Sequence, residues 1–325
     1  MIDVTQSGLS TINSCVFGFI SIALNGFLIF VIYKQKSRVL ESYKYVMIAC
    51  AIFDICFSSV YIVASPTFAA TTEKSALLIV NGGIDMPTNC GRVLLIIFVF
   101  LFCQSIVISP SLFVFRYLQI CRKHSTFQSF RRLRCLFLML SSISTSVCGM
   151  ICFAAWPTAM DLKQFTKIAY RINVSRNTTF LVATLQKNDD LFVRIQSTSL
   201  FAGIIVVIVL MIFTMSLMIF CSIRIIYALL HTIPANTRHI QVQVCKTLAA
   251  QSISPLILLH LPFYISILAP LFEARTGEAS NYFPFLFAWC PVVNAVLVLY
   301  FVRDYRNFVV WFVKNKMFST GLVVF

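Results

Sequence analysis

A single carboxylate, Asp54, stands inside a long apolar stretch of this chain, and it is the first residue whose type and place could do chemistry. A charged side chain in hydrocarbon is costly and usually serves a function. The amides Asn25 and Asn294 stand in two other apolar stretches, and each of the three residues lies eight or nine residues from the basic end of its stretch. At a helical rise of ~1.5 Å per residue, their depths match at roughly 12–14 Å.

Matched depth lets Asn25, Asp54 and Asn294 share one hydrogen-bond network, provided that the three stretches are neighbours in space. Such a polar switch network can hold water or a cation, and its rearrangement can move a helix bundle between two packings. The alternative is a static polar clasp between helices, which contributes about 1 kcal/mol. The presence of a carboxylate at position 54 favours the switch.

Aromatic side chains collect in the other halves of these stretches, away from the basic ends. Phe98 and Phe102 are four residues apart and therefore share one face of a helix. The other candidates are His260, Phe263, Tyr264, Tyr282, Phe285 and Trp289, with Gln104 or His260 as a polar handle. Together they predict a pocket for a small, mostly apolar ligand. Because 32 of the 325 residues are Phe, helix packing or lipid contact is the alternative for each of them.

The sequence holds no motif typical of an enzyme. The patterns HExxH, GxSxG and the phosphate-binding loop are absent, and the four His show no metal-ligand spacing. Asp54 is the only carboxylate in an apolar stretch, so neither a paired-acid site nor a proton relay can form. We therefore expect no catalytic residue, no metal and no cofactor. The last three stretches lack lysine, which excludes a retinal Schiff base and with it a light-sensing pigment.

The stretches that position these residues are long enough to cross a membrane. Only 11% of the residues are charged and the mean hydropathy is +0.88, whereas soluble proteins have about 25% charged residues. A membrane-spanning helix needs about 20 mostly apolar residues. Seven runs qualify, at 12–33, 45–65, 93–115, 135–160, 195–223, 247–272 and 279–302. The predicted fold is an all-α bundle of seven transmembrane helices that forms one domain over residues 1–325.

Four of the prolines in the runs predict kinks. They are Pro110, Pro255, Pro262 and Pro291. Each removes a helix hydrogen bond, which can bend the helix and give a bundle a place to move. Such prolines are also common in static membrane helices.

The charged loops indicate how the bundle is oriented. The first, third and fifth connections and the C-terminal tail form one side, which carries 17 Lys and Arg, whereas the other side carries 9. Cytoplasmic loops have the excess of positive charge. We therefore expect the N-terminus outside and a short tail, residues 303–325, in the cytoplasm. The net charge of +15 is then explained by membrane topology and does not indicate nucleic acid.

Two N-glycosylation triplets, at Asn173 and Asn177, support that orientation independently. Both lie in the loop 161–194, which the charges place outside. Glycosylation requires a lumenal or extracellular loop. The two observations agree, and they predict a glycosylated outer loop.

The predicted inner side has two further features. A basic group there comprises Arg122, Lys123, Arg131, Arg132 and Arg134. A cytoplasmic partner and attraction to anionic lipid explain this group equally well. In the tail, Phe308, Trp311 and Phe312 share one helical face, so the tail could lie on the membrane surface. The alternative for the tail is a few extra turns of the seventh span.

Five stretches in order along the chain narrow the class. They are LNGFLIFVI, SYKYVMIACAIFDI, FVFRYLQIC, KTLAAQSISPLILLHLPF and PVVNAVLVLYFVRDYRN. In these stretches, and over nearly its whole length, the chain resembles the nematode serpentine chemoreceptors of the Str type, which are seven-transmembrane G-protein-coupled olfactory receptors. The resemblance implies a receptor that binds a small odorant in the outer half of the bundle and activates a heterotrimeric G protein. It further implies the plasma membrane, in the sensory cilium of chemosensory neurons.

The same resemblance carries particular residues. Arg116 resembles the arginine of the Asp-Arg-Tyr motif of rhodopsin-like receptors, although Phe115 stands in place of the acid. The G-protein contact that the resemblance implies comprises Arg116, Tyr117, Arg122, Lys123, Arg131, Arg132 and Lys246. Cys90 stands where many such receptors tie the third span to the second outer loop, but that loop has no cysteine here. Cys90 is then free or pairs elsewhere, for example with Cys152.

A seven-span ligand-gated channel or transporter is the alternative function. Insect-type odorant channels have a cytoplasmic N-terminus, which the loop charges oppose. A transporter would place more ionisable groups at mid-membrane than Asp54 and His260. A degenerate receptor that binds no ligand is a third reading.

Overall fold

The computed structural model describes residues 4–35, 41–71, 76–84, 86–121, 126–158, 161–163, 165–166, 179–184, 191–231, 235–265 and 282–319. The glycosylation triplets at Asn173 and Asn177 lie outside these ranges, as do Arg122 and Lys123. The roles expected of these four residues therefore stay predictions.

Seven helices among the described residues are long and apolar enough to cross a membrane, which confirms the predicted fold class. Six of them lie in α1 (Val4–Lys34), α2 (Glu41–Ala64), α3 (Thr88–Cys121), α4 (Thr126–Ala154), α6 (Leu191–His231) and α9 (Phe283–Phe301). The sixth span in chain order, Cys245–Ile265, combines part of α7 (Ala235–Pro255), the π-helix η1 (Leu256–His260) and residues 261–265.

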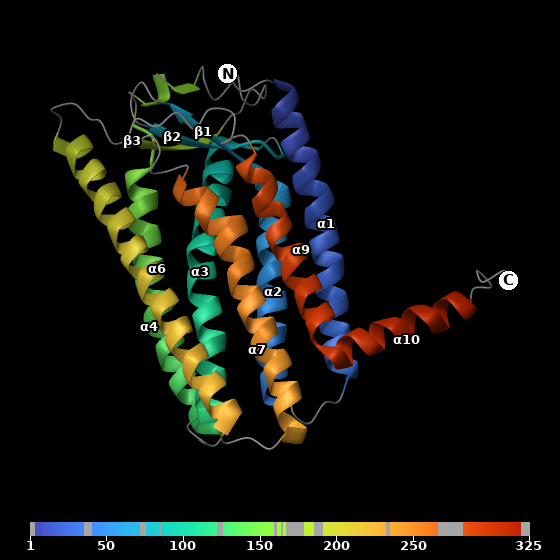
Figure 1. The fold of residues 1–325 in the computed structure, drawn as a ribbon. Helices are drawn as coiled ribbons and strands as arrows, with labels where there is room; N and C mark the ends of the chain where they lie inside the picture. The colour runs from blue at the N-terminus through green and yellow to red at the C-terminus, as the bar shows by residue number, and fades with distance from the viewer. Residues whose placement is uncertain are drawn as a thin grey trace.

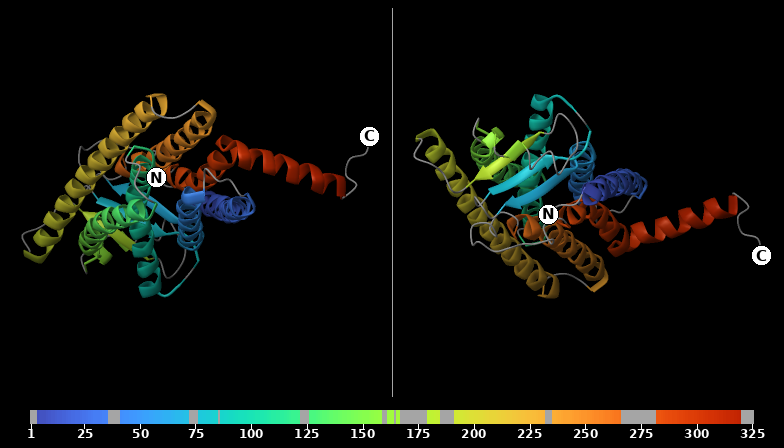
Figure 2. Two further views of the ribbon diagram at one scale, coloured as in Figure 1. Left: turned by 90° about the horizontal axis from the view of Figure 1, so that it is seen from below. Right: turned by 90° about the horizontal axis from the view of Figure 1, so that it is seen from above.

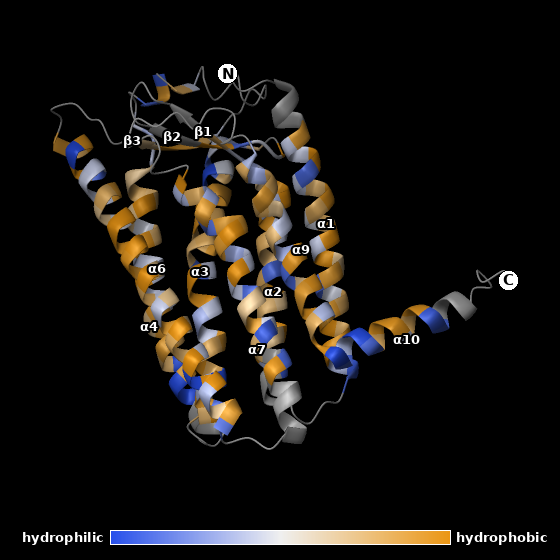
Figure 3. Ribbon diagram, viewed as in Figure 1, coloured by the Kyte–Doolittle hydropathy of each residue, from blue (hydrophilic) through white to orange (hydrophobic). Residues whose placement is uncertain are grey.

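The seven helices stand side by side in one bundle (Figures 1 and 2). Helix α1 packs against α2 and α9, and α3 packs against α4 and α6. Apolar residues dominate the middle of the helices, and polar residues gather near the lower ends in the view of Figure 3. We call the end of the bundle that carries the β-strands the sheet end, and the opposite end the α10 end.

A three-stranded antiparallel sheet lies across the sheet end (Figure 1), and it is an addition to the predicted all-α bundle. Its order is β1 (Pro66–Thr71), β2 (Ala76–Asn81) and β3 (Phe180–Thr184). The register places Phe68 opposite Ile79 and Ile79 opposite Leu181. Directly paired residues point to the same face of a sheet. All three side chains belong to the buried apolar cluster at this end of the bundle.

The sheet is tied to the helices by backbone hydrogen bonds. The Val182 amide donates to the carbonyl of Ala155, just after α4, at 2.9 Å. The Gly82 amide, directly after β2, donates to the carbonyl of Ala64, the last residue of α2, at 3.2 Å. The described part of the loop 161–194 is therefore held by strand pairing and packing, while Cys90 and Cys152 are both free thiols.

Gly83 makes the tightest approach where the chain leaves β2. Its amide donates to the carbonyl of Ala64 at 3.1 Å, and a Cβ atom at this position would lie 2.0 Å from the carbonyl oxygen of Val63. No real Cβ contact is that short, and the obstructing atom is backbone, which cannot rotate away. The end of α2 and the end of β2 can approach this closely only because residue 83 lacks a side chain.

We expect Gly83→Ala to destabilise the fold by about 1–3 kcal/mol, because the added methyl forces the two backbones apart. Thermal unfolding of the detergent-solubilised protein measures the effect as a lower melting temperature. The control is Gly149→Ala in α4, where a Cβ atom meets nothing within 4 Å. That variant should be as stable as the natural protein or more stable, because alanine favours a helix over glycine by about 1 kcal/mol. Equal melting temperatures for the two variants would contradict the assignment.

The sixth span changes from α-helix to π-helix directly after Pro255, one of the prolines that were predicted to kink their helices. Pro255 ends α7 and has no amide hydrogen to donate, and η1 follows it directly. The amide of Leu261 then bonds the carbonyl of Leu256, five residues back. Such π-helical turns change which side chains face a neighbouring helix and are frequent at functional sites. Here the turn contains His260, which is buried against α3.

The tail forms a separate helix, α10 (Arg303–Ser319), which leaves the bundle at a steep angle (Figure 1). Val302 interrupts the helix with extended backbone, φ −83° and ψ 107°. Phe308 and Phe312 of α10 pack against Phe30 of α1, at ring-centroid distances of 6.3 and 6.2 Å, whereas Trp311 is 57% exposed. This geometry favours a surface helix over an extension of the seventh span.

Candidate functional site

A cluster of aromatic rings fills the sheet end of the bundle. This aromatic cluster comprises Phe57 and Tyr61 of α2, Phe68 of β1, Phe98 and Phe102 of α3, Phe263 after η1, and Phe287 of α9. Each side chain is at most 5% exposed. Contacting rings have centroids between 4.1 and 6.4 Å apart. Phe57 and Tyr61 are stacked, and the other contacts are tilted or edge-to-face, which are favourable arrangements for aromatic pairs.

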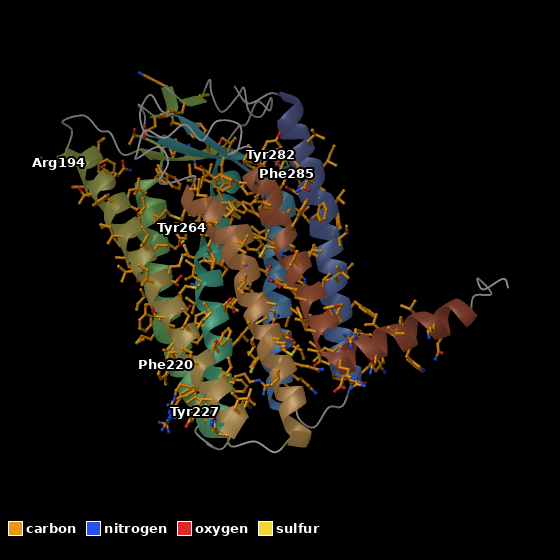
Figure 4. All side chains as sticks on the ribbon, in the orientation of Figure 1. Arg194, Phe220, Tyr227, Tyr264, Tyr282 and Phe285 are labelled. Carbon is orange, nitrogen blue, oxygen red and sulfur yellow. The ribbon has the colours of Figure 1, made fainter. Side chains whose placement is uncertain are left out.

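Four of the predicted ligand-binding residues meet in or beside this cluster. Phe98, Phe102 and Phe263 are members of it, and His260 packs edge-on against Phe102 at 5.2 Å. Tyr264 (Figure 4) packs edge-on against Phe263 at 6.1 Å, but its other neighbours form a different buried cluster between α3, α4 and α6.

The other four predicted residues point elsewhere. Gln104 faces α4, where its amide donates to the hydroxyl of Thr145 at 3.1 Å and accepts from Ser141 at 2.9 Å. Trp289 faces α1, where its indole donates to Asn13 at 3.1 Å. Tyr282 is 55% exposed, and the ring of Phe285 packs against it at a tilt, 6.2 Å away, at the start of α9 (Figure 4).

Two polar groups beside the aromatic cluster bond to the protein itself. The hydroxyl of Tyr61 donates to the carbonyl of Pro284 at 2.6 Å, which ties α2 to α9. The ring nitrogen Nε2 of His260 lies 3.4 Å from the hydroxyl of Ser105 on α3. The ring nitrogen Nδ1 of His260 and the hydroxyl of Tyr264 are buried and have no hydrogen-bond partner among the described residues. The centre of the cluster itself is lined by apolar side chains.

Asp54 and Asn294 meet in the middle of the bundle, as their depths predicted. The amide nitrogen of Asn294 donates to a carboxylate oxygen of Asp54 at 3.4 Å. Both residues line a cavity of about 40 Å³ between α2, α3, the sixth span and α9, together with Ser105, Ser109 and Gln251. This volume suffices for about three water molecules, and the lining supplies the polar partners that buried water requires.

Asn25 lies beside this pair but bonds to other groups. Its amide donates to the carbonyl of Ser21 at 3.0 Å and to the carbonyl of Pro291 at 3.3 Å, which links α1 to α9. The hydroxyl of Ser21 is 2.7 Å from that of Ser58 on α2. The network therefore has two parts, one at Asn25 and one at Asp54, and both contact α9 within one helical turn.

The Asp54 cavity adjoins the aromatic cluster, and Phe57 belongs to both. Phe57, Leu259 and Cys290 line the Asp54 cavity and also belong to the buried cluster at the sheet end. A change in ring packing at the sheet end therefore reaches the surroundings of Asp54 directly. Ser58, Tyr61, Phe68 and Phe287 were not among the predicted site residues.

At the α10 end, the predicted G-protein contact residues divide into buried and exposed groups. Arg116 is only 2% exposed and donates to Gln119 at 3.3 Å. Tyr117 is half-buried and packs edge-on against Phe220 (Figure 4) at 5.9 Å. The exposed group comprises Arg131 and Arg132 on α4 and Lys246 on α7.

Tyr305 of α10 closes this end of the bundle beside Arg116. Its side chain is 1% exposed. The pKa of the Tyr305 hydroxyl is raised to about 12. Burial is the main cause and the carboxylate of Asp304 adds to it, while the charge of Arg116 opposes the shift. The phenol is therefore protonated at neutral pH. Arg116 could contact a partner only after this packing opens.

Seven apolar helices around a polar centre define a seven-transmembrane protein with the rhodopsin fold. The crystal structure of squid rhodopsin superposes with a TM-score of 0.59 at 14% identity, covering 98% of this chain and 88% of the rhodopsin chain. At that identity the likeness establishes the fold alone.

The chain belongs to the Str family of serpentine-type seven-transmembrane G-protein-coupled chemoreceptors, whose family model matches residues 10–310. It is similar to the G-protein coupled receptor str-33 of Caenorhabditis elegans, 22% identical over 89% of this chain and 87% of that protein. It is also similar to the serpentine receptor class r-10 of the same organism, 22% identical over 87% of this chain and 85% of that protein. The predicted family is thus confirmed, and the protein is a multi-pass membrane receptor rather than a member of an enzyme family.

Proposed function

We propose that this receptor binds a small, mostly apolar odorant at the aromatic cluster and activates a heterotrimeric G protein from the α10 end. The observation that carries the proposal is the position of Phe57, which belongs to the aromatic cluster and also lines the Asp54 cavity. A ligand that moves this side chain changes the cavity, and the cavity contacts both α2 and α9. The membership in a G-protein-coupled chemoreceptor family supports a receptor over a channel or transporter.

Asn25, Asp54 and Asn294 are proposed to form the switch between ligand and G protein. Bistable packing is a common way for small shifts at one site to reach another. The bonds from Asn25 to Pro291 and from Asn294 to Asp54 both end on α9, beside the proline that interrupts its hydrogen bonding. This arrangement favours α9 as the element that moves.

The direct test is a calcium or cAMP assay in cells that express the receptor and are exposed to an odorant panel. We expect one or more small apolar compounds to evoke a response that requires a G protein. A ligand-evoked current that persists when G-protein signalling is blocked would favour the channel instead. Silence across a broad panel, with the receptor at the cell surface, would contradict the proposed function.

We propose that the sheet end faces the outside of the cell and that the α10 end faces the cytoplasm. The family resemblance supports a location in the plasma membrane of a sensory cilium. The uneven loop charges and the triplets at Asn173 and Asn177 support this orientation.

We expect endoglycosidase to increase the electrophoretic mobility of the expressed receptor, because the loop 161–194 is glycosylated in this orientation. A double variant, Asn173→Gln with Asn177→Gln, should already run at the faster mobility and should not shift further. An unchanged wild-type mobility would remove the glycan support. Protection of an N-terminal tag from antibody on intact cells would overturn the orientation outright.

A further inference from the structure

We propose that Phe68 is a built-in stand-in for the ligand, and that the receptor takes benzenoid compounds whose single ring displaces the Phe68 ring from the aromatic cluster. This inference rests on the proposed function, because it names the chemical class of ligand for that same site.

Phe68 comes from outside the transmembrane helices, yet it is one of the most deeply buried residues. It lies in β1, which connects α2 to β2, and its side chain is 1% exposed. Its ring contacts Phe98 of α3 at 6.4 Å, Phe263 of the sixth span at 6.0 Å and Phe287 of α9 at 5.4 Å. A residue of the connection between α2 and α3 therefore supplies the ring that contacts three membrane helices.

The contacts of Phe68 define what could replace it. The interplanar angles to Phe263 and Phe287 are 88° and 86°, so both contacts are edge-to-face. This geometry depends on the charge distribution of an aromatic ring, which a saturated chain of equal size lacks. Removal of the Phe68 ring would leave an apolar space of ring size, and apolar cavities of that kind stay dry and bind benzene.

The connection of β1 to the protein is suited to releasing Phe68. Among the described strands, β1 is at an edge of the sheet, whereas β2 is paired on both sides. Ser65, directly before β1, has a φ of 37°, a left-handed conformation that is unfavourable for a residue with a side chain. Release of β1 would break its pairing with β2. Strand β2 stays anchored to α2 through the Gly82 amide on the carbonyl of Ala64, and β3 stays anchored through the Val182 amide on the carbonyl of Ala155.

The placement of Phe68 also connects ligand exchange to the interior. Phe98, which it touches, packs on Phe57, and Phe57 lines the Asp54 cavity. Phe287 lies one turn before Pro291, which lines the same cavity. A ligand ring can take a position that the Phe68 ring, which is attached to β1, cannot reach. Replacement of the Phe68 ring by a ligand ring therefore changes the packing of α2 and α9.

The test measures binding of fluorobenzene to the purified full-length receptor by ¹⁹F NMR titration. In the natural protein the probe competes with the tethered ring, whereas in Phe68→Ala it enters an open site. We expect Phe68→Ala to bind fluorobenzene at least about tenfold more tightly than the natural protein. The reason is that the Phe68 ring no longer has to leave the site before the probe can bind. Phe68→Leu, which fills part of the space and covers the case in which Phe68→Ala does not fold, should bind with intermediate affinity.

Phe19→Ala is the matched control, because Phe19 is 64% exposed and its loss opens no buried space. This variant should bind like the natural protein. Equal affinities for the natural protein and the Phe68 variants would overturn the proposal, and cyclohexane binding as tightly as fluorobenzene would overturn the benzenoid class. The binding measurement needs no G protein. Saturable fluorobenzene binding by a receptor that gives no response in the odorant assay would therefore contradict the proposed function and leave this proposal standing.

Discussion

Asp54→Ala is expected to reduce odorant-evoked signalling by about tenfold or more while the receptor still reaches the cell surface. The carboxylate lines the cavity that adjoins the aromatic cluster and accepts the hydrogen bond from Asn294. If this contact couples the ligand site to the α10 end, its loss removes a coupling free energy of roughly 1–3 kcal/mol, which corresponds to about 5- to 150-fold. The dose–response curve of a panel odorant that activates the natural receptor gives the measurement.

Stability should not fall in parallel with signalling. A carboxylate in a membrane-spanning helix costs about 2.5–3.5 kcal/mol by insertion scales, so Asp54→Asn should keep or raise the melting temperature while it also impairs signalling. The control is Ser59→Ala on the same helix, whose hydroxyl bonds only the carbonyl of Ile55 among the described groups. Unchanged signalling in Asp54→Ala would refute the switch, and loss of surface expression alone would favour a static clasp.

The helices could be predicted from the sequence because membrane insertion imposes a simple rule. A run of about 20 apolar residues must satisfy its own backbone hydrogen bonds, which a helix does. Depth along a helix is likewise fixed by counting residues, and this is why the contact of Asp54 with Asn294 could be anticipated. The partner of Asn25 could not, because the carbonyl of Pro291 that it bonds is a backbone group with no sequence signature.

The direction in which a side chain faces was harder to predict than its depth. Gln104 is two residues from Phe102, which is roughly 200° around a helix, so it faces α4 while Phe102 faces the aromatic cluster. The same offset separates Trp289, which faces α1, from Phe287, which lies in the cluster. A pattern of aromatic residues without known neighbours does not tell which face is inside.

The sheet and the position of Phe68 could not be predicted from the sequence, for a different reason. The strand Ala76–Asn81 reads as a short apolar run, which periodicity cannot distinguish from part of a helix. Its partners lie far away in sequence, and β3 pairs with it from the loop after α4. Phe68 becomes interpretable only once that pairing places its strand over the bundle.

The double variant Arg131→Gln with Arg132→Gln is expected to slow G-protein activation by about tenfold, since electrostatic steering raises association rates by about 10- to 1,000-fold. Both side chains are exposed at the α10 end of α4, and Lys246 is exposed at the same end on α7. Nucleotide exchange on a purified G protein, measured with the receptor in neutral-lipid nanodiscs, gives the rate. The rate should also fall with rising salt in the natural receptor, and fall less in the variant.

A matched control removes two positive charges from the opposite end of the bundle. Lys163→Gln with Arg194→Gln changes exposed residues at the sheet end, where Arg194 lies in the first turn of α6 (Figure 4). If the charges at positions 131 and 132 act on the G protein, this control activates it at the natural rate. If they serve only to hold anionic lipid, then neither double variant affects the rate in neutral lipid, because the lipid charge that they would bind is absent. If only the sheet-end control slows activation, then the G protein contacts the sheet end and the proposed orientation is wrong.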